Sequence, residues 1–120
     1  MSDQLSNQPE NIRPWGRYDI LEEGESYKVK RITVNPGGRL SYQSHERRAE
    51  FWIVVSGSAV VTLDDVRIER TRGESVTIPM RAKHRMENAG SEPVVFIEVQ
   101  TGTYFGEDDI VRYSDDYGRT

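Results

Sequence analysis

The sequence predicts an all-β sandwich or barrel, and three observations lead to that class. Short runs rich in β-branched and aromatic residues recur along the chain, as in residues 50–56. Glycine and proline turn signals separate these runs at intervals of roughly 8–12 residues. No apolar repeat keeps the 3.6-residue period of a helix for more than about two turns. At 120 residues the chain has the length of one domain.

The expected strands follow one another along the whole middle of the chain. The first ends at Pro36-Gly37-Gly38, a strong turn signal, and Gly57 allows a tight turn between two later strands. In chain order we expect strands over residues 27–34, 39–45, 50–56, 58–63, 66–71, 75–78, 84–88 and 94–101.

The two ends of the chain differ from this middle part. Residues 1–10 are polar, which predicts a flexible N-terminal arm, and residues 11–120 then form the single domain. Residues 104–120 are acidic and aromatic, and we expect a short turn of helix near residues 107–110.

Composition and charge exclude several classes of function. The net charge of −4 gives no general attraction to nucleic acid, so no nucleic-acid partner is expected. No apolar run reaches the ~20 residues of a membrane span, so no membrane partner is expected. The first ten residues lack the basic and apolar regions of a signal peptide, and the chain has no cysteine, which together favour the cytoplasm. Local basic clusters are still compatible with a small anion such as a phosphate monoester.

Each of the two histidines in the chain lies in a spaced motif that is typical of a metal ligand. The first motif is Gly37-x5-Gln43-x-His45-x4-Glu50-x6-Gly57, and the second is Gly73-x5-Pro79-x4-His84-x3-Asn88. Together they predict one metal site with the ligands Gln43, His45, Glu50 and His84. This mixed nitrogen and oxygen set suits a divalent metal, with Zn first and Mn, Co, Ni or Fe as alternatives. The other interpretation is a hydrogen-bonded polar cluster without a metal.

Strand periodicity supports convergence of these ligands. Side chains alternate across a strand, so Gln43 and His45 share one face, and Glu50 shares the face of Trp52 on its own strand. The opposite face of residues 50–56 is also apolar, which indicates a cover by a second sheet or by a partner subunit. A homodimer is therefore expected.

The two motifs resemble those of the cupin superfamily, a double-stranded β-helix (jelly-roll) barrel that binds a metal between its strands. The usual first motif has histidine where this chain has Gln43. The remaining motif positions are kept, namely His45, Glu50, Gly57, Gly73, Pro79, His84 and Asn88. The resemblance implies an all-β cupin fold for this domain.

A narrower resemblance covers nearly the whole chain from Arg13 onward. It is carried by RPWGRYDIL, YKVKRITVNPGGRLSYQSH, RAEFWIVVSGSAVVTL, ESVTIP, KHRMEN, IEVQTGTYFGEDDIVR and DDYGR. These segments resemble type II mannose-6-phosphate isomerases, commonly the C-terminal domain of bifunctional mannose-1-phosphate guanylyltransferase/mannose-6-phosphate isomerases. In that branch glutamine is usual at the first ligand position. The resemblance implies a metal-dependent isomerase that interconverts mannose 6-phosphate and fructose 6-phosphate through an enediol and feeds polysaccharide synthesis.

One departure keeps a second hypothesis open. The family commonly has a histidine-rich run before the Arg-Ala-Glu triplet and another histidine after it. Here the run is Glu46-Arg47, and Phe51 follows the triplet. The alternative is a non-catalytic cupin module that binds a sugar phosphate or a sugar nucleotide. A third hypothesis, an iron oxygenase, is disfavoured by Gln43, because oxygenases more often carry a full histidine set.

Four further residues are candidates for the chemistry. Glu98 lies in an apolar strand, where a carboxylate is costly unless it is paired or functional, and it is the candidate base together with Lys30. Arg48 and Arg112 are the candidates for binding the phosphate of the substrate. Each has a structural alternative, which is an edge position or ion pair for Glu98, a solvated strand face for Lys30, a carboxylate of the fold for Arg48 and a surface ion pair for Arg112.

Overall fold

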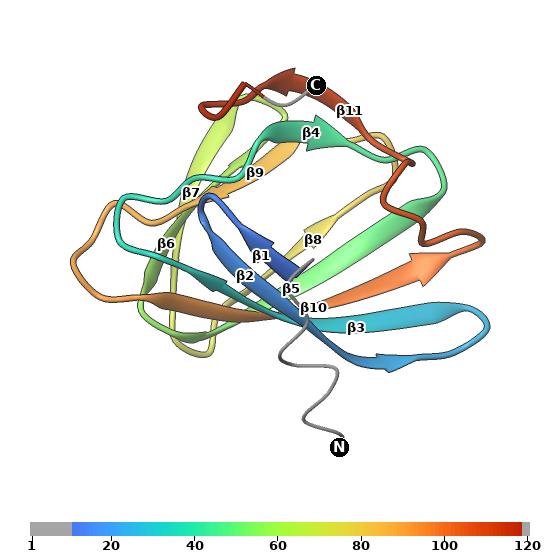
Figure 1. Cartoon of the computed structure of the whole chain (residues 1–120), viewed down its shortest axis with the longest axis horizontal. Helices are drawn as coiled ribbons and strands as arrows, with labels where there is room; N and C mark the ends of the chain where they lie inside the picture. The colour runs from blue at the N-terminus through green and yellow to red at the C-terminus, as the bar shows by residue number, and fades with distance from the viewer. Residues whose placement is uncertain (1–10, 119–120) are drawn as a thin grey trace.

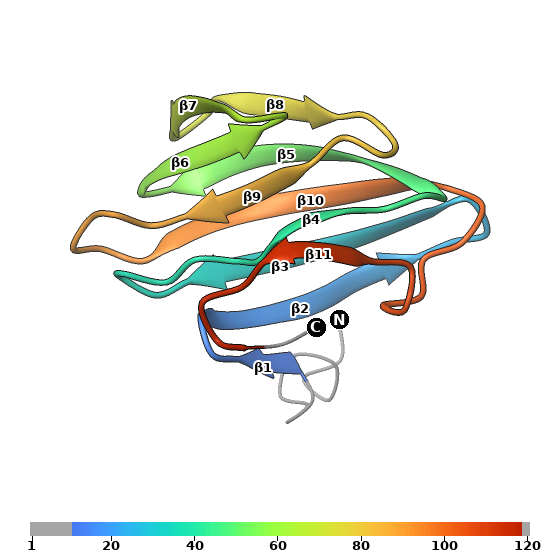
Figure 2. The ribbon, with the colours of Figure 1, turned by 90° about the horizontal axis from the view of Figure 1, so that it is seen from above.

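Two antiparallel β-sheets pack face to face in the computed structural model, which describes residues 11–118 (Figure 1, Figure 2). No α-helix occurs within those residues, and the arm expected over residues 1–10 lies outside them. The larger sheet has the strand order β1-β2-β3-β10-β5-β8 and the smaller one β11-β4-β9-β6-β7. The strands are β1 (Ile12–Arg13), β2 (Gly16–Glu23), β3 (Tyr27–Val34), β4 (Tyr42–Ser44), β5 (Arg48–Ser56), β6 (Ser58–Leu63), β7 (Val66–Thr71), β8 (Ser75–Ile78), β9 (His84–Glu87), β10 (Val94–Gly102) and β11 (Val111–Ser114).

The all-β class and most of the expected strands are confirmed. The strands expected over residues 58–63, 66–71 and 75–78 have the observed bounds of β6, β7 and β8. The strand expected over residues 39–45 is shorter, because only β4 and an isolated bridge from Arg39 to Glu87 pair there.

The expectations about the chain ends need correction. The strands β1, β2 and β11 are not among the expected ones, although β2 is eight residues long. The turn of helix expected near residues 107–110 is wrong. That segment forms one tight turn in which the amide of Asp109 donates to the carbonyl of Gly106.

The inner face of the larger sheet changes from apolar to polar along its strands. Phe96 on β10 lies between Ile32 on β3 and Val54 on β5, and these three side chains are buried in the core. Two residues further along β10, Glu98 lies between Lys30 and Trp52. One end of the space between the sheets is therefore a hydrophobic core, and the other end is lined by polar and charged groups.

Two residues of the spaced motifs have structural roles that explain their identity. Gly57 has a φ of +84°, and a Cβ atom there would lie 2.6 Å from the carbonyl oxygen of Pro93. The buried amide of Asn88 donates to the carbonyls of Val34 and Glu92 at 3.0 and 2.7 Å, and it accepts from the amide of Gly90. These positions shape the apolar end of the barrel, away from its polar lining.

Candidate metal centre

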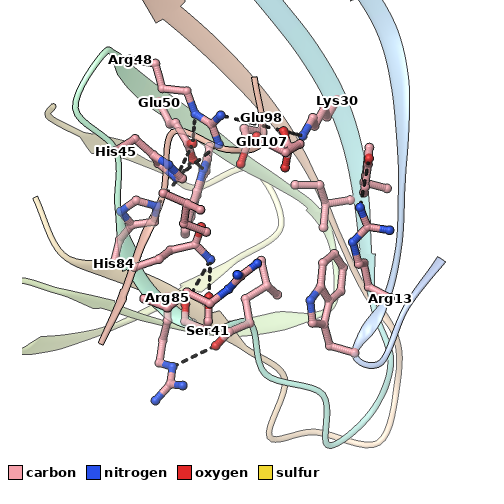
Figure 3. Close-up of a pocket in the computed structure, with 18 residues that line it drawn as sticks. Arg13, Lys30, Ser41, His45, Arg48, Glu50, His84, Arg85, Glu98 and Glu107 are labelled. Atoms are coloured by element: carbon pink, nitrogen blue, oxygen red, sulfur yellow. Dashed lines mark hydrogen bonds and ion pairs between the residues drawn. The ribbon is translucent and has the colours of Figure 1, made fainter. Parts of the chain in front are cut away.

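His45, Glu50 and His84 converge between the two sheets, as the sequence predicts (Figure 3). One potential ligand atom from each lies within 4.8 Å of the others, and the three side chains are buried. Nε2 of His45 is 3.3 Å from one carboxylate oxygen of Glu50, and Nε2 of His84 is 3.9 Å from the other. Glu50 belongs to the larger sheet and His84 to the smaller one, so the cluster joins the two sheets.

Backbone carbonyls fix both imidazoles in the tautomer that a metal needs. Nδ1 of His45 lies 2.7 Å from the carbonyl oxygen of Asp109, and Nδ1 of His84 lies 3.0 Å from that of Ala82. A carbonyl oxygen only accepts, so Nδ1 carries the proton in each ring and Nε2 presents its lone pair. This outer hydrogen bond is the usual way in which proteins orient a metal-binding histidine.

The protonation states of the cluster also suit a cation. Burial lowers the pKa of His45 to about 4, against the attraction of Glu50, so its ring is neutral at pH 7. Burial opposes ionisation of Glu50, yet His84, Arg48 and His45 hold the pKa of this carboxyl well below its usual range. The neutral imidazole of His45 and the carboxylate of Glu50 need to lose no proton before they bind a divalent ion.

Gln43, the fourth predicted ligand, lines the same cavity. It lies on β4 as the register partner of His84 on β9. Its amide nitrogen donates to the hydroxyl and the carbonyl of Ser41 at 2.9 and 3.2 Å, so the amide oxygen is the group that could bind a metal. Two imidazole nitrogens, a carboxylate and an amide oxygen fit a divalent first-row metal.

Arg48 lies against the cluster and contacts a carboxylate of the fold, which is the structural alternative that the sequence left open for it. Its Nε donates to Glu50 at 2.9 Å, and its Nη2 donates to Nε2 of His45 at 3.2 Å. The indole of Trp52 donates to the other oxygen of Glu50 at 2.8 Å. The carboxylate of Glu50 is therefore held in place on both of its oxygens.

Glu98 and Lys30 lie on the inner face, so the edge position for Glu98 and the solvated face for Lys30 are both wrong. The two are register partners on β10 and β3, and their exposed fractions are 5% and 4%. Burial and the nearby charge of Glu50 raise the pKa of Glu98 to about 8, although Lys30 acts in the opposite direction. Gln100 donates to Glu98 at 2.7 Å. Glu98 is thus a buried, proton-carrying carboxyl beside the cluster.

Arg112 lines the cavity from β11, where it pairs with Gln43 of β4. The cavity has an empty volume of about 610 Å³, which includes its open mouth. It is lined by all eight residues that the sequence singled out, namely Lys30, Gln43, His45, Arg48, Glu50, His84, Glu98 and Arg112.

Two acidic residues of the β10–β11 connection contact the site and are not among the predicted residues. Glu107 pairs with Lys30 at 2.9 Å. Asp109 accepts from the amides of Glu46 and Arg47, at 3.0 Å each, and its carbonyl holds His45. The acidic run GEDD in the sequence could have drawn attention to these two residues. The position of a residue in a loop, however, does not reveal where its side chain lies.

The fold and the site define a class, the cupin double-stranded β-helix. A mutant of the oxalate decarboxylase OxdC of Bacillus subtilis matches with a TM-score of 0.77 and 22% identity, over 91% of this chain and 31% of that one. A Klebsiella pneumoniae protein described as having a double-stranded β-helix domain matches with a TM-score of 0.73 and 20% identity, over 89% and 93% of the two chains. At these identities the likeness shows the fold alone.

Within that class, the chain belongs to the family described as mannose-6-phosphate isomerase, C-terminal, whose pattern matches residues 2–115. The xanthan biosynthesis protein XanB of Xanthomonas campestris pv. campestris (strain B100) is 55% identical over 90% of this chain and 23% of its own length. The alginate biosynthesis protein AlgA of Pseudomonas aeruginosa is 52% identical, over 98% and 24% of the two lengths. A mannose-1-phosphate guanylyltransferase of Escherichia coli K12 is 51% identical, over 92% and 23%. The chain thus spans about a quarter of these relatives.

The part of the chain from residue 11 to residue 118 contains no helix that is long and apolar enough to span a membrane.

Proposed function

We propose that this domain is a metal-dependent aldose-ketose isomerase that interconverts mannose 6-phosphate and fructose 6-phosphate. One observation carries the proposal. A metal-ligand set, a buried carboxyl with a raised pKa and two buried cations line a single cavity in a chain of the mannose-6-phosphate isomerase family. The names of the relatives, which include xanthan and alginate biosynthesis proteins, support a role in polysaccharide synthesis, and we place that role in the cytoplasm.

The reaction moves a proton between C1 and C2 of the sugar through an enediol, so it needs a base and a means of stabilising negative charge on oxygen. Glu98 in its ionised form is the proposed base, because a carboxylate whose pKa is raised binds a proton more strongly than an ordinary one. It takes the proton from one carbon and returns it to the neighbouring carbon. Lys30, its register partner, is the buried cation that would meet the enediolate oxygen or the phosphate of the substrate.

His45, Glu50 and His84, with Gln43, would hold the metal. A bound divalent ion, with Zn first and Mn, Co, Ni or Fe as alternatives, would supply Lewis-acid polarisation of the sugar carbonyl. Arg48 and Arg112, which line the same cavity, are the proposed partners of the phosphate.

A coupled assay with mannose 6-phosphate tests the proposal. The domain is assayed as purified, after chelation, and after addition of Zn, Co, Mn or Ni. We expect turnover that is lost on chelation and restored by at least one metal. Measurable binding of mannose 6-phosphate with no turnover under any of these conditions would reject the isomerase.

That outcome would favour the second function, a non-catalytic module that binds a sugar phosphate or a sugar nucleotide. A specific contact supports this alternative. Arg48 donates to Nε2 of His45, the atom that a metal would use, so the guanidinium competes with an ion for that lone pair. The run Glu46-Arg47, where the family commonly has histidines, points the same way.

A further inference from the structure

The connection between β10 and β11 places a carboxylate on two cations at the mouth of the cavity (Figure 3). Nζ of Lys30 is 2.9 Å from Oε2 of Glu107, and Nη1 of Arg48 is 3.9 Å from the same oxygen. The side chains of Lys30 and Arg48 are each 5% exposed, whereas that of Glu107 is 51% exposed. The cations belong to the barrel wall, and the anion belongs to a loop.

These cations have hydrogen-bond donors that Glu107 leaves without an acceptor. Among the residues that the structure describes, Nη1 of Arg48 is buried and has no hydrogen-bond partner. Lys28 is a third buried cation at this end of β3, and burial, reinforced by Lys30, lowers its pKa. Buried cations of this kind are costly unless an anion neutralises them and accepts their hydrogen bonds.

Glu107 is ionised in this position, and the ion pairs of its carboxylate with Lys30 and Arg48 are what hold its side chain there. Burial favours its protonated form, yet Lys30 and Arg48 keep the pKa of Glu107 below its usual value. The loop has a separate anchor at Asp109, whose carboxylate accepts from the amides of Glu46 and Arg47. Release of Glu107 from the cations therefore moves a half-exposed side chain into water and leaves the anchor at Asp109 intact.

We infer that Lys30 and Arg48 form a binding site for a phosphate monoester, and that Glu107 occupies this site as an internal anion until the phosphate displaces it. The inference rests on the proposed function for the identity of the substrate, and it adds a source of selectivity. A phosphate monoester carries about −1.5 to −2 charges and three acceptor oxygens, so it can satisfy Lys30 and the unused Nη1 together. A neutral sugar has no negative charge with which to displace Glu107 from these cations. Unphosphorylated sugars are therefore excluded from this part of the cavity.

Isothermal titration with inorganic phosphate tests this displacement without any need for turnover. The protein as purified is compared with Glu107→Gln, which removes the charge and keeps the shape. Glu46→Gln is the matched control, because it removes a carboxylate whose ion pair is with the exposed Arg81. Loss of the competing anion should tighten phosphate binding in Glu107→Gln by at least about fivefold, and the control should match the parent. Ionic strength is kept constant so that screening is equal.

Lys30→Gln provides a second readout, with the thermal melt of each variant recorded to show that it is folded. It should weaken phosphate binding at least about tenfold, because it removes a buried cation from the site. Phosphate binding in Glu107→Gln that equals or falls below that of the parent would overturn the inference, and so would parent-like binding by Lys30→Gln. Failure of the proposed function would instead appear as absent isomerase turnover with the phosphate titrations behaving as expected.

Discussion

Nδ1 of His84 contacts the backbone and its Nε2 faces the cluster, so a substitution can test the contribution of this ring to metal binding. Its Nδ1 proton goes to the carbonyl of Ala82, and its Nε2 faces Glu50. We expect His84→Ala to lose the metal, because the three remaining ligands, His45, Glu50 and Gln43, hold an ion far more weakly than four. Elemental analysis of the purified variant measures the loss.

Glu87→Gln is the control for that experiment, because Glu87 lies on the same strand, β9, and pairs with the exposed Arg67. It should keep the metal content of the parent. A folded His84→Ala protein with an undiminished metal content would contradict the assignment of the centre.

A substitution of Glu98 should affect catalysis and not metal binding, since Glu98 contacts the cluster but is not one of the expected ligands. Glu98→Gln keeps the shape of the side chain and removes its ability to exchange a proton. If Glu98 is the base, kcat should fall by about 10²–10⁴ with metal content unchanged. Steady-state kinetics and elemental analysis on the same preparation check both parts, and a kcat within about threefold of the parent would assign the base elsewhere.

The sequence could predict that His45, Glu50 and His84 converge, because each lies in a spaced motif. The inward direction of Glu50 follows from strand alternation, whereas the pairing of Gln43 with His84 depends on which strands the fold brings together. The contact between Arg48 and His45 could not be predicted, since it depends on the rotamer of a long side chain. The same is true of Glu107, whose place depends on the path of a loop.

At the scale of elements, the strands between clear turn signals in the middle of the chain were predictable, whereas β1, β2 and β11 were not. The strand β2 has the sequence GRYDILEE, in which Asp19 is buried and forms ion pairs with Arg17 and Arg31. A buried carboxylate breaks the apolar alternation that marks a half-buried strand. The strand β11 is short and mostly exposed at the edge of its sheet, so it carries little pattern at all.

Gly57 and Gly73 lie in the two connections that pass from one sheet to the other, β5 to β6 and β7 to β8, and comparing them separates the cost of backbone conformation from the cost of close packing. Gly57 and Gly73 have nearly equal φ values of +84° and +86°. A Cβ atom on Gly57 would meet the carbonyl oxygen of Pro93 at 2.6 Å, whereas one on Gly73 would meet nothing within 4 Å. Gly73→Ala should therefore cost about 1 kcal/mol of backbone strain, and Gly57→Ala a further 1–3 kcal/mol, roughly, from the clash.

Urea denaturation of both variants measures these free energies of unfolding, provided that the slope with denaturant stays unchanged. Equal losses for the two substitutions would show that the contact with Pro93 relaxes without cost.

At the scale of the whole molecule, the outer face of the larger sheet exposes apolar side chains, and the homodimer that the sequence predicts would cover them. Phe51 and Val55 on β5 are 41% and 46% exposed, and Val95, Ile97 and Val99 on β10 lie beside this strand. If a second copy covers this face, Phe51→Glu should convert the protein to a monomer, because a buried unpaired carboxylate is costly. Sedimentation equilibrium measures the mass, and Val66→Glu on the smaller sheet is the control, since Val66 is already 61% exposed. A parent protein that sediments as a monomer would contradict the dimer.

The candidate metal centre also links the two sheets, which gives a prediction for the stability of the entire barrel. Glu50 comes from β5 of the larger sheet, His84 from β9 of the smaller sheet, and His45 follows β4 of the smaller sheet directly. An ion held by all three binds the native state and finds no such site in the unfolded chain, so it stabilises the fold by mass action. At a free metal concentration of about 100 times Kd this amounts to about 2.7 kcal/mol, which should raise Tm by roughly 10 °C. Calorimetry of the parent with and without a chelator measures the shift, and His84→Ala should show almost none. A parent whose Tm is the same with metal and with chelator would mean that no ion joins the sheets.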